Sequence, residues 1–137
     1  MKVSEVIRLL EQDGWYFARQ RGSHRQYRHP TKPGRVTVAG KPSDEVAAGR
    51  LRKHLPSGWN SKGGSLHVST WVVVYERTST GWSAYVPALP GLAATGATRP
   101  EVEQLIRDGI PLHLEGLAED GLPIPDPASV EAEAVAV

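Results

Sequence analysis

The chain has 137 residues, of which 39% are hydrophobic and 23% charged, a composition typical of a folded globular protein. It contains no Cys, which excludes a disulfide framework, a thiolate nucleophile and a thiolate-bound metal. The net charge of +1 conceals a division, because residues 1–57 carry 12 Lys and Arg against 5 Asp and Glu, whereas residues 71–137 carry 3 against 10. This asymmetry predicts a basic module that binds a polyanion and an acidic module that imitates a polyanion or covers the basic one.

Apolar segments are short throughout the chain. The densest run, Val72-Val73-Val74, is far shorter than a membrane span, and the N-terminus lacks the apolar stretch of a secretory signal. We therefore expect a soluble, cytoplasmic protein with no membrane partner.

The first module is predicted to have the order α-β-β-β-α. Apolar residues at helical spacing predict a helix over residues 4–13, with Ser4 as N-cap and Gly14 as the stop. Residues 15–19 and 24–28 form a predicted hairpin, residues 35–38 a third strand, and a second helix is expected from Ser43 or Asp44 to Leu55.

A second module follows residues 58–70, whose Gly and Ser content predicts a flexible linker. Strands are predicted over residues 71–76 and 82–86, with a short third one over 92–95, and Thr98 begins a capping box that starts a helix. Gly109 and Pro111 predict a kink or a break near Asp108, and residues 130–137 alternate like an edge strand. We therefore predict an α+β fold with two small domains, residues 1–57 and residues 71–137, the second in the order β-β-β-α-β.

One histidine of the basic module has a setting that suits RNA cleavage. His24 follows a Gly22-Ser23 turn among arginines. A neutral imidazole can take the proton from a ribose 2′-hydroxyl while cations stabilise the charge that develops on phosphorus, and this chemistry needs no metal or other cofactor. The alternative is that Gly22-Ser23 only closes a hairpin and His24 is a surface residue.

The cations around His24 provide candidate RNA contacts. Arg21, Arg25 and Lys41 are candidate phosphate ligands, and Tyr27 is a candidate for stacking on a base. The alternative is a solvated basic face without a ligand. No pair of His and carboxylate residues has the spacing of a recognised metal site, so we predict none.

Two sets of motifs resemble known families, one in each half of the chain. Residues 1–55 resemble the HicA toxin family, and residues 71–137 resemble the HicB antitoxin family. The HicA resemblance rests on Met1 to Ile7 with Leu9-Leu10, Gly14-Trp15, Arg21 to His24 with Tyr27, Val36 to Lys41, and Gly49 to Arg52. The HicB resemblance rests on Gly81 to Pro87, Leu89 to Gly91, Ala94 to Gly96, His113 to Leu117, Asp120-Gly121 and Pro123 to Pro125.

The resemblance implies a fused type II toxin–antitoxin protein. The first half would be a metal-independent endoribonuclease acting on mRNA, with a double-stranded-RNA-binding-domain-like fold and His24 as general base. The second half would be its inhibitor, with a partial ribonuclease-H-like fold. It would dock on the toxin within the chain or between chains of a homo-oligomer.

Two expectations complete the sequence analysis. The HicB resemblance lacks a C-terminal DNA-binding segment, so we expect no sequence-specific binding of DNA. The alternative function is a noncatalytic RNA-binding or regulatory protein whose toxin site is permanently silenced.

Overall fold

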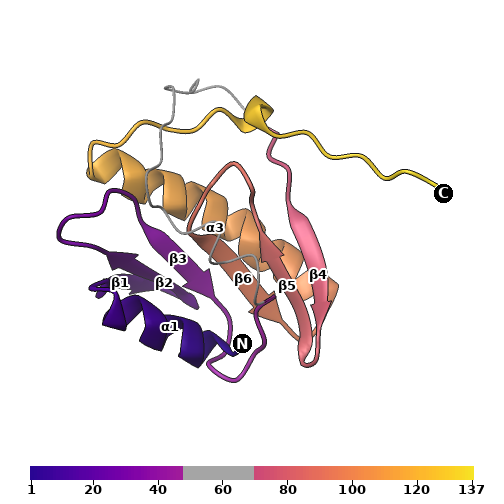
Figure 1. Ribbon diagram of the computed structural model, residues 1–137, viewed down its shortest axis with the longest axis horizontal. Helices are drawn as coiled ribbons and strands as arrows, with labels where there is room; N and C mark the ends of the chain where they lie inside the picture. Colours follow the sequence, from indigo (N-terminus) through magenta and orange to yellow (C-terminus); the bar gives the residue numbers. More distant parts are fainter. Residues whose placement is uncertain (48–69) are drawn as a thin grey trace.

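In the N-terminal part of the chain, the described residues 1–47 fold as one helix on a three-stranded antiparallel sheet. The structure, a computed structural model, describes residues 1–47 and 70–137. Helix α1 (Val3–Gln12) precedes β1 (Tyr16–Arg21), β2 (His24–Arg28) and β3 (Val36–Ala39), and the strands pair in that order (Figure 1). The predicted first helix, hairpin and third strand are confirmed.

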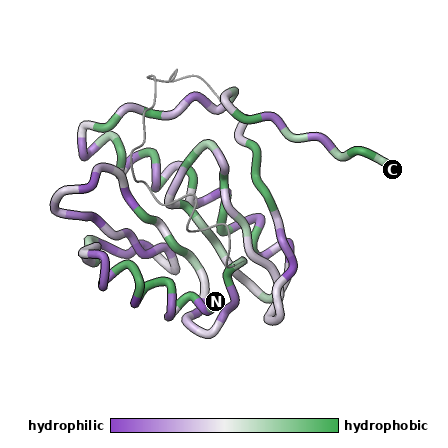
Figure 2. Tube along the Cα trace, in the orientation of Figure 1, coloured by the Kyte–Doolittle hydropathy of each residue, from purple (hydrophilic) through white to green (hydrophobic). Residues whose placement is uncertain are grey.

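Helix α1 has one apolar face but is not capped by the predicted residue. Hydrophobic and hydrophilic residues alternate along it (Figure 2). Its residues Val3, Val6 and Leu10 are buried. The N-cap is Lys2, without a side-chain cap, so the prediction of Ser4 is wrong. Backbone carbonyls of the loop after β3 accept from the first-turn N–H groups of Val3 and Ser4 instead. These hydrogen bonds satisfy N–H groups of the first turn that a capping side chain would otherwise satisfy.

The loop after β3 is not the start of a helix. The predicted helix at Ser43 or Asp44 is wrong as far as residue 47, because this stretch forms turns and a single bridge between Lys2 and Glu45. The rest of that prediction, and the predicted linker up to residue 69, lie outside the described residues.

The second half supplies three strands and a long helix. Strands β4 (Val74–Thr78), β5 (Gly81–Tyr85) and β6 (Leu92–Gly96) precede helix α3 (Arg99–Glu119). All three predicted strands are present. Thr98 caps α3, because its side chain accepts a hydrogen bond from the Glu101 N–H as the capping box predicts.

The two predicted modules share one sheet. Its order is β1-β2-β3-β6-β5-β4, and the joint is a parallel pairing of β3 with β6. Thr37, Val38 and Ala39 lie opposite Leu92, Ala93 and Ala94. The α+β class is thus confirmed, and the strands of the described residues form one six-stranded mixed sheet rather than two separate ones.

Helix α3 runs without interruption through Gly109 and Pro111, so the predicted break near Asp108 is wrong. Pro111 removes one backbone hydrogen bond, which costs about 3 kcal/mol in an isolated helix. The buried residues of α3 include Val102, Ile106 and Leu117, and this packing on the sheet offsets that cost.

The chain beyond α3 leaves the sheet. A short 3-10 helix, η2 (Pro127–Ser129), is followed by an extended segment that projects away from the fold (Figure 1). The predicted edge strand over residues 130–137 is wrong, because the segment has no strand partner among the described residues. Its alternating pattern is visible in Figure 2, but alternation yields a strand only where a sheet edge supplies hydrogen bonds.

The sheet is covered by a helix on each face. Helix α1 packs on Tyr27, Val36 and Val38, whereas α3 packs on the face that carries Leu92 and Ala94 (Figure 1). Each core also takes one residue from the other half, Ala93 in the first and Ala39 in the second. Because neighbouring residues of a strand face opposite ways, His24 lies on the α3 face and Tyr27 on the α1 face. No helix in the described residues is long and apolar enough to cross a membrane.

Candidate active site at the junction of the two halves

His24 lies beneath α3 at the start of β2. The Gly22-Ser23 turn precedes it, and Gly22 adopts a φ of 54°, a left-handed conformation that glycine adopts without strain. The side chain of His24 is only 6% exposed, and its Nε2 lies 2.7 Å from the carbonyl oxygen of Leu105 in α3. A carbonyl can only accept a hydrogen bond, so Nε2 carries a hydrogen in this arrangement.

The surroundings of His24 are closely packed. The space enclosed by His24, Arg19, Arg21, Gln26 and Leu112 has no room for a water molecule. A phosphodiester therefore cannot reach the imidazole through this space while α3 is in place.

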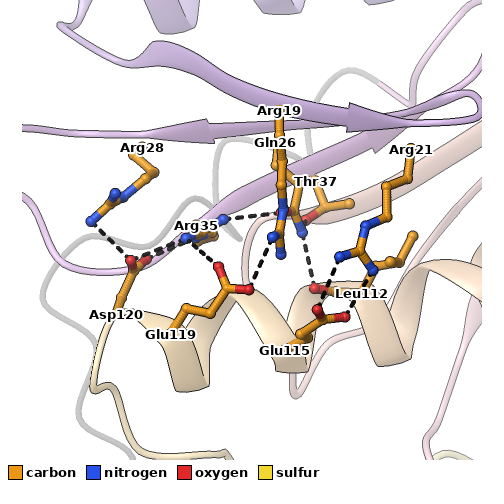
Figure 3. A network of polar contacts seen from close by, with 10 residues as sticks. All are labelled: Arg19, Arg21, Gln26, Arg28, Arg35, Thr37, Leu112, Glu115, Glu119 and Asp120. Carbon is orange, nitrogen blue, oxygen red and sulfur yellow. Dashed lines mark hydrogen bonds and ion pairs between the residues drawn. The ribbon is translucent and has the colours of Figure 1, made fainter.

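Carboxylates of α3 and its C-cap neutralise the arginines beside His24 (Figure 3). Arg21 donates two hydrogen bonds of 3.0 Å to Glu115, and Arg19 Nη1 lies 2.9 Å from a carboxylate oxygen of Glu119. Asp120 Oδ1 forms an ion pair with Arg28 Nη2 at a distance of 2.9 Å. The basic side chains on this face are thus engaged by the acidic half of the chain.

Arg35 forms the most buried of these ion pairs. Its side chain is 4% exposed and donates to Asp120 at 2.8 and 3.1 Å, and these hydrogen bonds raise the pKa of the guanidinium. Arg35 also donates to the Gln26 amide oxygen at 3.0 Å, and the Gln26 amide nitrogen donates to the Leu112 carbonyl at 3.0 Å. This network joins β2 and β3 to the second half of α3.

A second histidine, His113 of α3, lies at the centre of the same junction. Its Nε2 lies 3.2 Å from the Pro90 carbonyl and must donate to it, so Nδ1 accepts a 2.7 Å hydrogen bond from the Thr37 hydroxyl. The ring is fully buried, and burial lowers its pKa to about 4. His113 is therefore neutral near pH 7.

Four of the predicted RNA contacts line one groove beside His24. Gly22, Ser23, Arg25 and Lys41 surround a volume of about 450 Å³ that is also bounded by Leu105 of α3. Two carboxylate residues, Asp44 and Glu101, share its lining, along with Gln20, Gly40 and Pro42. The Nη1 atom of Arg25 is buried without a hydrogen-bond partner in the described part of the chain.

The remaining predicted contacts lie elsewhere. Arg21 belongs to the ion pair with Glu115, outside the groove. Tyr27 is 3% exposed on the opposite face of the sheet, where its ring packs edge-on against Phe17 and burial raises the pKa of its hydroxyl. This arrangement leaves no surface of Tyr27 on which a base could stack.

Sequence analysis did not single out Gln26 or His113 as parts of this junction. Gln26 shares the His24 face of β2, and His113, the first residue of one HicB-like motif, lies four residues after Gly109 on the buried face of α3. Among residues 1–47 and 70–137, no group of three or more His, Asp or Glu side chains is arranged to hold a metal ion.

Comparison with known proteins gives a family match for the N-terminal part of the chain. No curated protein and no solved structure gives a significant match. Residues 3–56 match the family model described as HicA toxin of bacterial toxin-antitoxin, so the N-terminal part of the chain is similar to that family.

Proposed function

We propose that the chain is a fused toxin–antitoxin protein. Residues 1–57 are an endoribonuclease that cleaves mRNA, and residues 71–137 are a HicB-like inhibitor that holds it inactive. The match of residues 3–56 to the HicA toxin family supports the first part. The burial of His24 beneath α3 is the observation that carries the second.

His24 acts as the general base in the proposed reaction. It accepts the proton of a ribose 2′-hydroxyl, the oxygen attacks the adjacent phosphorus, and the 5′-oxygen leaves and is protonated by solvent. The products are a 2′,3′-cyclic phosphate and a 5′-hydroxyl end. Arg25 and Lys41, which line the groove beside His24, contact the phosphates of the substrate.

Inhibition follows from two properties of the closed junction. The Leu105 carbonyl occupies the hydrogen-bonding direction of His24 Nε2, so this nitrogen cannot accept a proton. Glu115, Glu119 and Asp120 take the places that RNA phosphates would take on Arg19, Arg21 and Arg28. The acidic half therefore excludes the polyanion and blocks the base at the same time.

The parallel pairing of β3 with β6 favours a second candidate function. A sheet shared by both halves, with cores that each include a residue of the other half, is harder to open than two domains touching at their surfaces. In this alternative the toxin site is permanently silenced, and the chain is a noncatalytic RNA-binding or regulatory protein.

RNA cleavage by the separated halves distinguishes the two functions. We expect the chain, cut at a protease site inserted between Gly63 and Gly64 and then diluted, to cleave RNA in the presence of a metal chelator and to leave cyclic phosphate ends. His24→Gln should abolish this cleavage, whereas the matched control His29→Gln, in the loop after β2, should retain it. Cleavage that persists in His24→Gln, or that requires added magnesium, would refute the assignment.

A further inference from the structure

Helix α3 carries a repeated pattern on the side that faces the toxin domain. Leu105 and Leu112 are each followed four residues later by a glycine, Gly109 and Gly116, and both glycines are buried. The backbone carbonyls of these two leucines accept hydrogen bonds from the side chains of His24 and Gln26 in β2. The two glycines of α3 are thus placed one helical turn beyond the two carbonyls that bind the sheet.

Helix geometry connects each glycine with its carbonyl. A carbonyl of residue i points toward residue i+4, and a helical side chain covers the turn that precedes its own Cα. A side chain at position 109 would therefore stand beside the Leu105 carbonyl. Glycine leaves that carbonyl open to a donor from outside the helix.

Neighbouring atoms already occupy the space that a side chain at position 109 or 116 would need. A Cβ added at Gly109 would lie 3.3 Å from both Cδ2 and Nε2 of His24 and 3.0 Å from Leu92 Cδ1. A Cβ added at Gly116 would lie 2.8 Å from Cδ of Arg35, whose side chain is 4% exposed. Gly109 therefore abuts His24, whereas Gly116 abuts Arg35.

Helix propensity does not explain why positions 109 and 116 are glycines. A glycine in a helix interior is about 1 kcal/mol less favourable than alanine. A Cβ at either glycine would lie within 3.3 Å of a residue of the first half, and neither glycine has the left-handed φ that would require glycine. Their contribution is therefore to the contact between the helix backbone and the toxin domain.

We infer that Gly109 is the specificity-determining position of the inhibitory helix, because it lets the bare backbone of α3 seal the His24 imidazole through the Leu105 carbonyl. Helix α3 closes off His24 in two ways, one steric and one chemical. The helix excludes the substrate, and the carbonyl holds the hydrogen on Nε2, the nitrogen that faces it. A larger residue at position 109 pushes α3 away from His24 while leaving the ion pairs of Glu115, Glu119 and Asp120, which lie about two to three turns further along the helix.

The first test measures access to His24 in the full chain. We compare Gly109→Ala and Gly109→Val with the wild type, and use Ala118→Val, on the exposed face of the same helix, as the matched control. Diethyl pyrocarbonate modifies accessible imidazoles, and peptide mass spectrometry gives the rate for each histidine. We expect His24 to react about tenfold faster or more in Gly109→Val, because overpacking at a close contact opens it. Gly109→Ala should be intermediate, and Ala118→Val should match the wild type.

His113 serves as an internal control for the integrity of the fold, because its ring is completely buried in the same junction. It should stay unreactive in Gly109→Ala and Gly109→Val. Unchanged protection of His24 in Gly109→Val would overturn the inference. Parallel loss of protection at His113 in both variants would overturn it as well, because the glycine would then serve the fold as a whole.

The second test is spectroscopic, and its first measurement is made on the wild-type chain. Nitrogen-15 correlation spectra of the imidazole rings, with His24 assigned from the His24→Gln variant, should place a hydrogen on Nε2 in the intact wild-type chain. This hydrogen should exchange faster in Gly109→Val than in Ala118→Val. A wild-type ring with a hydrogen on Nδ1 and none on Nε2 would contradict the seal.

RNA cleavage separates this inference from the proposed function on which its biological meaning rests. If His24 becomes accessible in Gly109→Val and cleavage appears, both stand. If His24 becomes accessible without cleavage by either this variant or the cut chain, Gly109 keeps its role and the ribonuclease assignment fails. If cleavage appears while His24 stays protected, the assigned role of Gly109 fails.

Discussion

At the scale of single residues, α3 buries two histidines in different ways. His24 donates to a helix carbonyl, and its sequence neighbours Ser23 and Arg25 line a groove, whereas His113 is enclosed between Thr37 and Pro90. Sequence analysis singled out His24 because a histidine after a Gly-Ser turn among arginines is visible in one short segment. His113 gave no such signal, because its partners come from β3 and from the loop before β6.

The burial of His113 predicts a pH dependence of stability. Its pKa is about 4 in the folded chain and 6.5 in the unfolded chain, so the unfolded state binds the proton first as pH falls. The contribution of this group is complete above pH 6.5 and is lost progressively between 6.5 and 4. We expect a loss of about 2 kcal/mol between pH 7.5 and pH 5 that is absent in His113→Gln.

Urea unfolding of the two proteins at both pH values measures this difference directly. Comparing the change with pH, rather than the absolute stability, removes the constant cost of the substitution. The carboxylates titrate in both proteins and cancel in the comparison. An identical loss in the wild type and in His113→Gln would contradict the burial of a neutral ring at this site.

At the scale of elements, α3 determines how the two halves meet. Its N-terminal half carries the Leu105 carbonyl over His24, and its C-terminal half with the C-cap carries the carboxylates that pair with the arginines (Figure 3). Sequence analysis predicted its start from the capping box but placed a break at Gly109 and Pro111. It failed there because propensity is local, whereas the contacts that hold the helix together come from β2, β3 and β6.

The ion pairs of α3 should differ strongly in their contributions to stability. Arg35 is 4% exposed and Arg21 is 50% exposed. Removing Arg35 leaves the largely buried Asp120 carboxylate with only the half-exposed Arg28 as its partner, so Arg35→Met should cost about 3 kcal/mol. Arg21→Met should cost about 1 kcal/mol or less, because exposed pairs contribute little. Denaturant unfolding of both variants at one pH measures the difference.

A second substitution tests the cause of the larger effect. Combining Arg35→Met with Asp120→Asn removes the carboxylate that Arg35 leaves behind, so the double variant should be more stable than the sum of the two single effects implies. Equal costs for Arg35→Met and Arg21→Met would mean that burial does not set the strength of these pairs.

At the scale of the whole molecule, the charge division of the sequence matches the two sides of the junction. Ion pairs join arginines of the basic half to carboxylates of the acidic half. The arginines are Arg19, Arg21, Arg28 and Arg35, and the carboxylates are Glu115, Glu119 and Asp120. The sequence therefore predicted that the halves attract each other. It could not predict the parallel pairing of β3 with β6, because that pairing joins strands more than 50 residues apart and neither strand's pattern specifies its neighbour.

The same limit explains the error at the C-terminal end. Residues 130–137 have the alternation of an edge strand, yet β1 and β4 are the outermost strands of the sheet in the described part of the chain. A strand requires a neighbouring strand to pair with as well as alternating residues, and the local sequence shows only the alternation.

Cleavage of RNA as a function of dilution, after cutting between Gly63 and Gly64, tests the central claim most directly. A covalent tether gives an effective concentration on the order of millimolar, so the uncut chain should be inactive at every protein concentration. The cut chain should remain inactive while concentrated and become active as dilution separates the halves. Full activity of the uncut chain, or a cut chain whose halves separate without any cleavage, would contradict a ribonuclease held inactive by its own second half.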